Sequence, residues 1–378
     1  MKNILFINGT NNIGGGELSL LSIAKYYNKS SSIVSFGEGD YTHLLKKEGI
    51  HSIVLKNSSE LLDVKREQGI FGIVLKLKFL FLTLFEIRNI SKEYDVIYCN
   101  SQKAILLSLL ALLFNKKKII IHVRDMMDNP NISSFQRKVF TWLVNISEPV
   151  IIANSAATKN ALVSIGIKKK IEIVFNGIKE NENLKIKDTN KFIVAMFSRI
   201  SHWKGQEYFI EAIHLLQNNK DFNQFEFWIV GDAVMGSEEE KYKKKILSLI
   251  KQYNLENSVK LFGFIDDPMR YMKDIDVLVL PSIYPEPFGR VVVEAMLLQK
   301  VVIATNMGGV KEIIENDKSG LLVDLDHLAD NLANNFLSLY KNQEKYKSLA
   351  NEGYLRAKKY FTEEKMLSHI DTIIKGLH

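Results

Sequence analysis

Cysteine is almost absent from this 378-residue sequence, which contains a single one, Cys99. One thiol cannot build a disulfide framework or a cysteine-rich metal site, and the composition suits a reducing cytoplasm. Cys99 ends the segment Asp-Val-Ile-Tyr-Cys, which is typical of a strand interior. Redox chemistry at this residue is therefore not expected.

Long hydrophobic runs are missing as well. The longest apolar stretches, 73–85 and 104–114, are shorter than the ~20 residues that cross a bilayer, and Lys76 and Lys78 interrupt the first. We therefore expect no transmembrane helix. The N-terminus runs directly into the strand-like Ile-Leu-Phe-Ile without a cleavage-site pattern, so we expect no signal peptide and a cytoplasmic protein.

Several recognition motifs are absent too. The sequence has no Gly-Lys-Ser/Thr of a P-loop, no complete Gly-x-Gly-x-x-Gly, and no zinc or basic-aromatic motif of a nucleic-acid-binding module. We expect no nucleic acid partner.

Charge is divided unevenly along the chain. Residues 1–180 hold 24 Lys and Arg against 15 Asp and Glu, whereas residues 181–378 hold 26 against 28. A basic N-terminal half is compatible with an anionic membrane surface, a phosphorylated substrate or nucleic acid, and net charge alone does not choose among them.

Short β-branched and aromatic runs alternate with longer helical patterns along the whole chain. This alternation predicts an α/β protein with two doubly wound parallel-sheet domains. The expected strands are 3–7, 32–36, 51–55, 95–99, 118–123 and 149–153 in the first domain, and 191–197, 225–230, 258–261, 276–280, 300–304 and 320–323 in the second.

The domain limits follow from composition. The polar stretch 181–190 has few large apolar residues and is typical of a linker. We predict an N-terminal domain over 1–180, a C-terminal domain over 191–355, and a helix over 356–378 that packs back on the first domain.

Two strand-end loops carry groups suited to an anion. Gly14-Gly15-Gly16 lies between the first strand and a helical pattern, where bare N–H groups can approach a diphosphate. The alternative is a flexible βα loop. Arg199 and Lys204 follow the first strand of the second domain, where open α/β sheets bind ligands. Taken singly, either residue is better explained as a solvated loop cation, and their shared placement at the end of a first strand favours the functional interpretation.

The most informative stretch is PSIYPEPFGRVVVEAM, residues 281–296. Its prolines and Gly289 exclude a helix through Glu286, whereas 290–298 is a good helical run that carries Glu294. A loop carboxylate at a strand end can accept hydrogen bonds from sugar hydroxyls. Glu294 could instead be a charge on a solvated helix face, although its apolar neighbours disfavour this reading.

Over nearly its full length the chain resembles the retaining glycosyltransferases of family four, which have the GT-B architecture of two Rossmann-like domains facing a central cleft. The resemblance lies in Pro-Ser-(x)3-Glu-Pro-Phe-Gly-(x)4-Glu-Ala with the following Gly308-Gly309, and in Gly14–Glu17, Asn176-Gly177-Ile178 and the Arg199/Lys204 pair.

The resemblance implies a role for each matching residue. Arg199 and Lys204 would neutralise the donor diphosphate, Glu286 would contact the transferred sugar, and Glu294 would bind the ribose. Main-chain groups would supply the remaining donor contacts, at Gly15, Gly16, Phe264, Phe288 and Gly289.

His122 resembles the family's first-domain histidine beside the donor sugar, and a structural strand-end histidine is the alternative. Arg124 and Asp125 are either acceptor-site residues or a surface ion pair. We assign catalysis to His122, Arg199, Lys204 and Glu286, with no metal and no cofactor.

The implied activity is transfer of a sugar from a nucleotide diphosphate, by family frequency UDP, to a hydroxyl of a glycan or lipid-linked acceptor in cell-surface polysaccharide synthesis. Residues 73–85 are apolar nearly all round as a helix; burial explains most of this, but the basic first half permits peripheral docking at the inner face of an anionic plasma membrane. A GT-B epimerase and a catalytically silent sugar-nucleotide binder remain as alternatives. The sequence does not indicate the oligomeric state.

Overall fold

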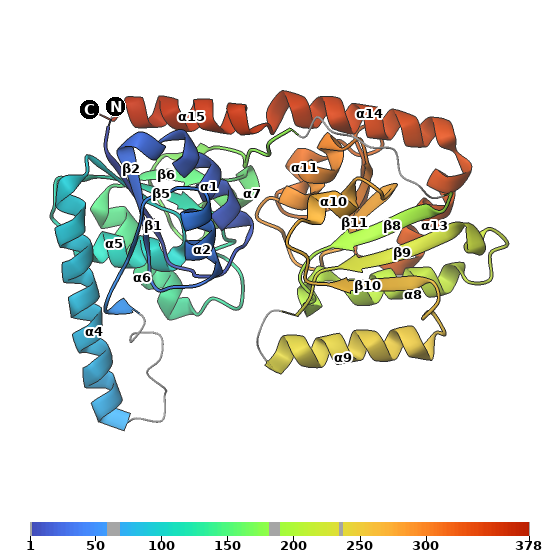
Figure 1. Ribbon diagram of the computed structural model, residues 1–378, viewed down its shortest axis with the longest axis horizontal. Coiled ribbons are helices and arrows are strands. Elements are labelled where there is room, and N and C mark those ends of the chain that lie inside the picture. Colours follow the sequence, from blue (N-terminus) through green and yellow to red (C-terminus); the bar gives the residue numbers. More distant parts are fainter. Residues whose placement is uncertain (1, 59–68, 181–189, 234–236, 378) are drawn as a thin grey trace. The chain divides into compact units, whose positions relative to one another are not determined.

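The structure is a computed structural model that describes residues 2–58, 69–180, 190–233 and 237–377, with the side chains of 69–75 and 237 left aside. The chain forms two compact units (Figure 1). Unit 1 comprises Met1–Gly177 and Glu363–His378, and unit 2 comprises Ile178–Thr362.

Unit 1 is built on a seven-stranded sheet in the order β3-β2-β1-β4-β5-β6-β7, with every neighbouring pair parallel. All strands expected for this part of the chain are present. β7 was not predicted from the sequence, because it is only three residues long and follows three lysines. The strands are β1 Ile4–Asn8, β2 Ser31–Ser35, β3 Ser52–Val54, β4 Val96–Cys99, β5 Lys118–Val123, β6 Val150–Ala153 and β7 Ile171–Ile173.

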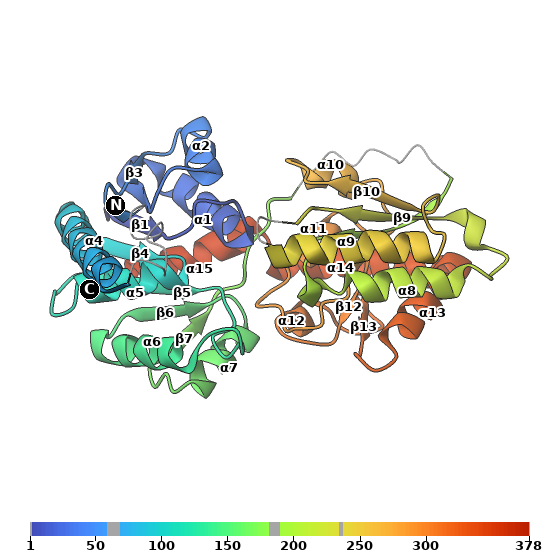
Figure 2. The same ribbon diagram turned by 90° about the horizontal axis from the view of Figure 1, so that it is seen from below.

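Helices cover both faces of this sheet, because alternate residues of each strand point to opposite sides. Leu5 and Ile7 pack in one core with α4, α5, α6 and α7, whereas Ile4 and Phe6 pack in the other with α1, α2 and α15. Figure 2 shows α4, α5 and α6 as neighbours in one layer. The helices are α1 Gly15–Tyr26, α2 Asp40–Lys47, α4 Gly69–Ile90, α5 Gln102–Ala111, α6 Ser134–Ser147, α7 Ala156–Ser164 and α15 Glu363–Lys375.

Unit 2 holds a six-stranded parallel sheet in the order β10-β9-β8-β11-β12-β13. Its strands are β8 Phe192–Phe197, β9 Phe225–Val230, β10 Val259–Gly263, β11 Val277–Leu280, β12 Val301–Thr305 and β13 Leu321–Val323. Its helices are α8 Gln206–Leu216, α9 Ser237–Gln252, α10 Pro268–Met272, α11 Arg290–Leu297, α12 Val310–Ile313, α13 Leu328–Lys341 and α14 Gln343–Tyr360.

The limits of the units differ from the limits expected from composition. The chain passes into unit 2 at Ile178, before the expected linker, and residues 181–189 of that linker lie outside the described residues. It leaves unit 2 after Thr362, so the segment expected to begin at 356 is divided between the two units. The N–H of Ile178 donates to the Phe361 carbonyl at 2.9 Å. This hydrogen bond joins the first residue of unit 2 to a residue near its end.

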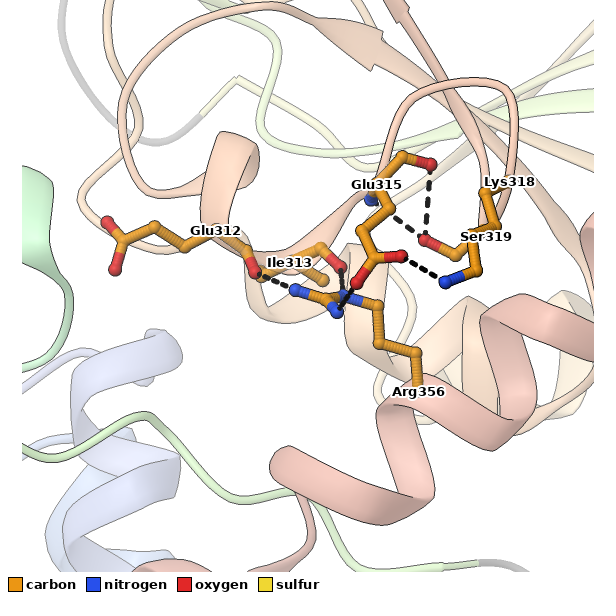
Figure 3. Close-up of polar contacts among 6 residues, drawn as sticks. All are labelled: Glu312, Ile313, Glu315, Lys318, Ser319 and Arg356. Atoms are coloured by element: carbon orange, nitrogen blue, oxygen red, sulfur yellow. Dashed lines mark hydrogen bonds and ion pairs between the residues drawn. The ribbon is translucent and has the colours of Figure 1, made fainter.

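Arg356 fastens α14 to the segment around α12 (Figure 3). Its guanidinium donates to the carbonyls of Ile313 at 2.6 Å and Glu312 at 2.8 Å and to the Glu315 carboxylate. Ser319 Oγ accepts from the Glu315 N–H at 2.9 Å. Because α14 also packs on α11, it connects the segment around α12 to the helix that follows the loop containing Glu286.

Over the residues that the structure describes, no helix combines the length and the apolar character needed to span a bilayer.

Candidate functional site

Three loops of unit 2 meet where the parallel strands β8, β11 and β12 end. Gly205 has φ +76°, and a Cβ added to it would lie 2.0 Å from the carbonyl oxygen of Pro281. Thr305 Oγ1 donates to the Ser282 carbonyl at 2.7 Å. Only glycine permits the first approach, and the loops therefore position one another at this sheet edge.

Lys204 and Glu286 form an ion pair at this meeting point. Lys204 Nζ lies 2.6 Å from Glu286 Oε1, and Ser282 Oγ donates to the same oxygen at 2.5 Å. Both side chains are largely buried, with 13% and 9% of their surfaces exposed. An ammonium has three N–H donors, so Lys204 can bind an anion while it keeps this partner.

Trp203 brings the two predicted cations together. The Lys204 Nζ lies 4.1 Å from the centre of its ring, and the Arg199 guanidinium carbon lies 5.6 Å from it. Arg199 is exposed, and its carbonyl accepts from Gln206 Nε2 at 2.7 Å. The sequence reasoning gave Trp203 no role. Its ring attracts both cations through cation–π contacts, which the sequence alone does not reveal.

Gly308 and Gly309 lie directly against the backbone of Glu286. A Cβ on Gly308 would be 2.3 Å from the main-chain carbonyl oxygen of Glu286, and a Cβ on Gly309 would be 2.4 Å from that of Pro287. The Gly309 N–H donates to the Glu286 carbonyl at 2.8 Å. These glycines belonged to the quoted sequence motif, and the structure explains why both positions lack a side chain.

The helix after Glu286 begins as predicted. Gly289, with φ +101°, caps α11, which starts at Arg290. Phe288 is buried, with its ring 5.8 Å from that of Phe361, so only its main chain is available to a ligand. Glu294 is partly buried and accepts from Arg290 Nη2 at 3.2 Å. Arg290 was not among the expected site residues.

Phe264 lies elsewhere in unit 2. It follows β10, the edge strand that β9 and β8 separate from β11, and its side chain is 73% exposed. Its ring therefore does not belong to the cluster of Arg199, Trp203, Lys204 and Glu286.

In unit 1, the glycine loop passes close to the end of β5. Gly14 precedes α1, which starts at Gly15. A Cβ on Gly16 would lie 3.3 Å from Arg124 Cδ, tighter than ordinary packing. The predicted residues Gly16 and Arg124 are thus neighbours.

Arg124 is buried and its guanidinium is held by three side chains. Nε donates to Asn100 Oδ1 at 2.8 Å, Nη1 donates to Asn176 Oδ1, and Nη2 lies 3.2 Å from His122 Nδ1. Four buried asparagines lie at or just after the carboxyl ends of strands at this sheet edge, and only Asn176 belonged to a sequence motif, because a single asparagine carries no spacing signal: Asn8, Asn100, Asn154 and Asn176. The contacts make Arg124 an organiser of this edge, whereas Asp125 is exposed.

The contacts of His122 determine where its proton lies. Tyr98 Oη is 2.6 Å from Nδ1, and Arg124, which has only donors, approaches the same atom. Nδ1 therefore accepts, and the proton is on Nε2. That Nε2–H is buried and has no partner among the residues that the structure describes. Burial and the Arg124 guanidinium hold the pKa of His122 well below its usual value.

We expect nitrogen-15 NMR of histidine-labelled protein to show His122 as the neutral Nε2–H tautomer, without titration near 6.5. The His122→Gln variant assigns the signal among the eight histidines. An Nδ1–H tautomer, or a pKa near 6.5, would contradict the hydrogen-bond assignment.

No cluster of histidine, cysteine and carboxylate side chains suited to a metal occurs within 2–58, 69–180, 190–233 and 237–377.

Family models match both parts of the chain. Residues 13–182 match glycosyltransferase family 4, and residues 178–356 match the glycosyl transferases group 1. An uncharacterised glycosyltransferase of Methanocaldococcus jannaschii is 30% identical over 262 residues, 67% of this chain and 68% of its own. The chain belongs to the family 4 glycosyltransferases, and its two Rossmann-like parallel-sheet units have the GT-B fold.

Two further relatives are informative. An N-acetylgalactosamine-N,N'-diacetylbacillosaminyl-diphospho-undecaprenol 4-alpha-N-acetylgalactosaminyltransferase of Campylobacter jejuni is 28% identical over 76% of this chain and 78% of its own. The crystal structure of Anabaena HepE in complex with UDP and glucose superimposes with a TM-score of 0.87 at 29% identity, covering 100% of both chains.

Proposed function

We propose that this enzyme transfers a sugar from a UDP-sugar to a hydroxyl of a glycan or lipid-linked acceptor, with retention at the anomeric carbon. The observation that carries the proposal is the buried Lys204–Glu286 pair, with Arg199 beside it, at the carboxyl edge of the unit 2 sheet. Structures of Anabaena HepE contain UDP and UDP-glucose, which supports the same donor class here.

Leaving-group stabilisation is the task assigned to the cations. The bond from the anomeric carbon to the phosphate oxygen breaks, and negative charge appears on the departing diphosphate. Lys204, Arg199 and the N–H groups at the start of α11 neutralise that charge without a metal. The acceptor oxygen bonds to the same face of the sugar, and its proton passes to a leaving phosphate oxygen, so no covalent intermediate on Glu286 is required.

Recognition of the donor is assigned to several further groups. Glu286 accepts hydrogen bonds from sugar hydroxyls, and Glu294 from those of the ribose. The main chain around Phe288 and Gly289 donates to sugar and phosphate. The His122 Nε2–H, which has no described partner, donates to a sugar hydroxyl. Main-chain groups at Gly15, Gly16 and Phe264 complete the set, and we propose Arg124 and Asp125 for the acceptor side.

The setting that we propose is cell-surface polysaccharide synthesis at the cytoplasmic face of the membrane. The Campylobacter relative is named for an acceptor on diphospho-undecaprenol, and a Staphylococcus aureus relative is named for capsular polysaccharide biosynthesis. Neither name fixes the acceptor of this chain.

The test begins with a thermal-shift panel of nucleotide sugars, in which a bound donor raises the unfolding temperature. Turnover of that donor is then followed with candidate acceptors, and NMR of the product reads the anomeric configuration. We expect UDP-sugars to bind and α-linked donors to give α-linked products, also after treatment with EDTA. Epimerised donor formed without acceptor, an inverted product, or binding without turnover would contradict the proposal.

A further inference from the structure

One face of α4 exposes large apolar side chains in a continuous stripe. Leu77, Phe81 and Phe85 are 59%, 69% and 57% exposed and follow each other at four-residue intervals, which places them on the same side of the helix. The opposite side is buried, with Thr83 and Ile87 fully covered. Apolar surface of this kind on a folded protein indicates an interaction site.

The neighbouring helices also expose apolar side chains. α5 lies beside α4 and α6 beside α5 in the layer visible in Figure 2. Exposed apolar side chains follow on both: Leu110 and Phe114 at the end of α5, and Phe135, Trp142 and Ile146 on one side of α6. Aromatic rings of this type favour the boundary between acyl chains and headgroups.

The surface is also basic. On α4, Lys78 and Arg88 are exposed, against one acid, Glu86, which is partly buried and whose carboxylate accepts from the Lys56 N–H at 3.1 Å. Lysines 116–118 follow α5, and the sequence of α6 contains Arg137 and Lys138 but no acid. Apolar side chains together with an excess of positive charge match an anionic bilayer better than they match a protein surface.

A shallow groove of about 410 Å³ adds a place for a phosphate group. Ser134, Arg137, Lys138 and Trp142 of α6 line it together with the end of α7. The Nε–H of Arg137 is buried and has no partner within the described part of the chain. Arginine and lysine beside a hydroxyl are a suitable set for a phosphate.

We propose that the outward surface of α4, α5 and α6 docks on a membrane that contains anionic lipid, with Leu77, Phe81, Phe85 and Trp142 in the interface and Arg137 on a lipid phosphate. The inference deepens the proposed function and rests on it, since an enzyme with a lipid-linked acceptor meets that acceptor at a bilayer. Its occupant is the lipid surface, and a second copy of the chain is the competing explanation.

Flotation of the full chain with vesicles tests the proposal. We expect binding to vesicles of phosphatidylcholine with phosphatidylglycerol, little binding to phosphatidylcholine alone, and weaker binding in high salt. The Leu77→Ser/Phe81→Ser/Phe85→Ser variant should partition about tenfold less or lower, because interfacial binding scales with buried apolar area. Leu215→Ser/Leu247→Ser/Leu355→Ser, at similarly exposed positions of unit 2, is the matched control.

Two more readouts separate the outcomes. Trp142 fluorescence should shift to the blue with anionic vesicles, and Trp142→Phe should lose that shift. Equal vesicle binding by both triple variants, no binding at all, or a dimer in solution that only the α4 variant loses would each overturn the proposal. Nucleotide-sugar binding is measured separately. If the unaltered chain turns over its donor but does not bind vesicles, the docking surface alone is rejected. If it binds vesicles but no donor, the proposed function alone is rejected.

Discussion

Replacement of Lys204 by methionine is expected to lower kcat by about 100- to 1,000-fold, the usual loss when one preorganised group that stabilises transition-state charge is removed. Lys204 Nζ is mostly buried beside Glu286, where charge interactions are stronger than in water. The same variant should bind UDP more weakly but uridine equally well, because only UDP carries the diphosphate. Calorimetric titration with both ligands and steady-state kinetics measure these effects.

Two controls keep the interpretation of Lys204→Met specific. Lys341→Met removes a half-exposed lysine that pairs with Asp221 at 3.6 Å and should leave kinetics unchanged. Lys204→Met also leaves the buried Glu286 carboxylate without its cation, so the unfolding free energies of Lys204→Met and Lys204→Met/Glu286→Gln are compared to measure this destabilisation apart from lost catalysis. Recovery of activity in that double variant, or an unchanged ratio of UDP to uridine affinity, would show that Lys204 does not hold the diphosphate.

The fold was predictable because each element carries its own periodic signal. Strand cores such as 118–123 and 276–280 are apolar runs bounded by polar residues, and the break at Gly289 placed the start of α11 correctly. The short β7 and the limits of the units were not predictable in this way. At those limits Ile178 is hydrogen-bonded to Phe361, which lies far away in the sequence, so contacts between distant segments determine where each unit ends.

The residues proposed for the site could be chosen from the sequence, but their contacts could not. Lys204 and Glu286 were each expected to contact the donor, yet their mutual ion pair depends on loops from β8 and β11 touching through Gly205. Trp203 and Arg290 were given no role from the sequence, because no recognised motif pointed to them. Arg124 was expected as an acceptor-side residue, and only the fold shows it held by Asn100, Asn176 and His122. That role of Arg124 stays a prediction.

Gly308→Ala is expected to lower kcat/KM by about 100-fold, because a displacement of about 1 Å in a catalytic group has this effect. Gly308 has φ +60°, and a Cβ added to it would lie 2.3 Å from the main-chain carbonyl oxygen of Glu286 and 2.7 Å from its main-chain nitrogen. Backbone atoms cannot turn away as a flexible side chain would, so the loop that carries Glu286 must move. The strained φ and the overpacking together should lower the unfolding free energy of unit 2 by about 2–5 kcal/mol.

Gly49→Ala separates the two causes. Gly49 has φ +68°, close to that of Gly308, but nothing lies within 4 Å of its Cβ position. This variant should therefore show only the left-handed strain of about 1–2 kcal/mol and keep its activity. Hydrogen exchange should rise over residues 281–289 in Gly308→Ala alone. If Gly308→Ala were as active as Gly49→Ala and equally protected there, the close packing of Gly308 on Glu286 would not be what positions this carboxylate.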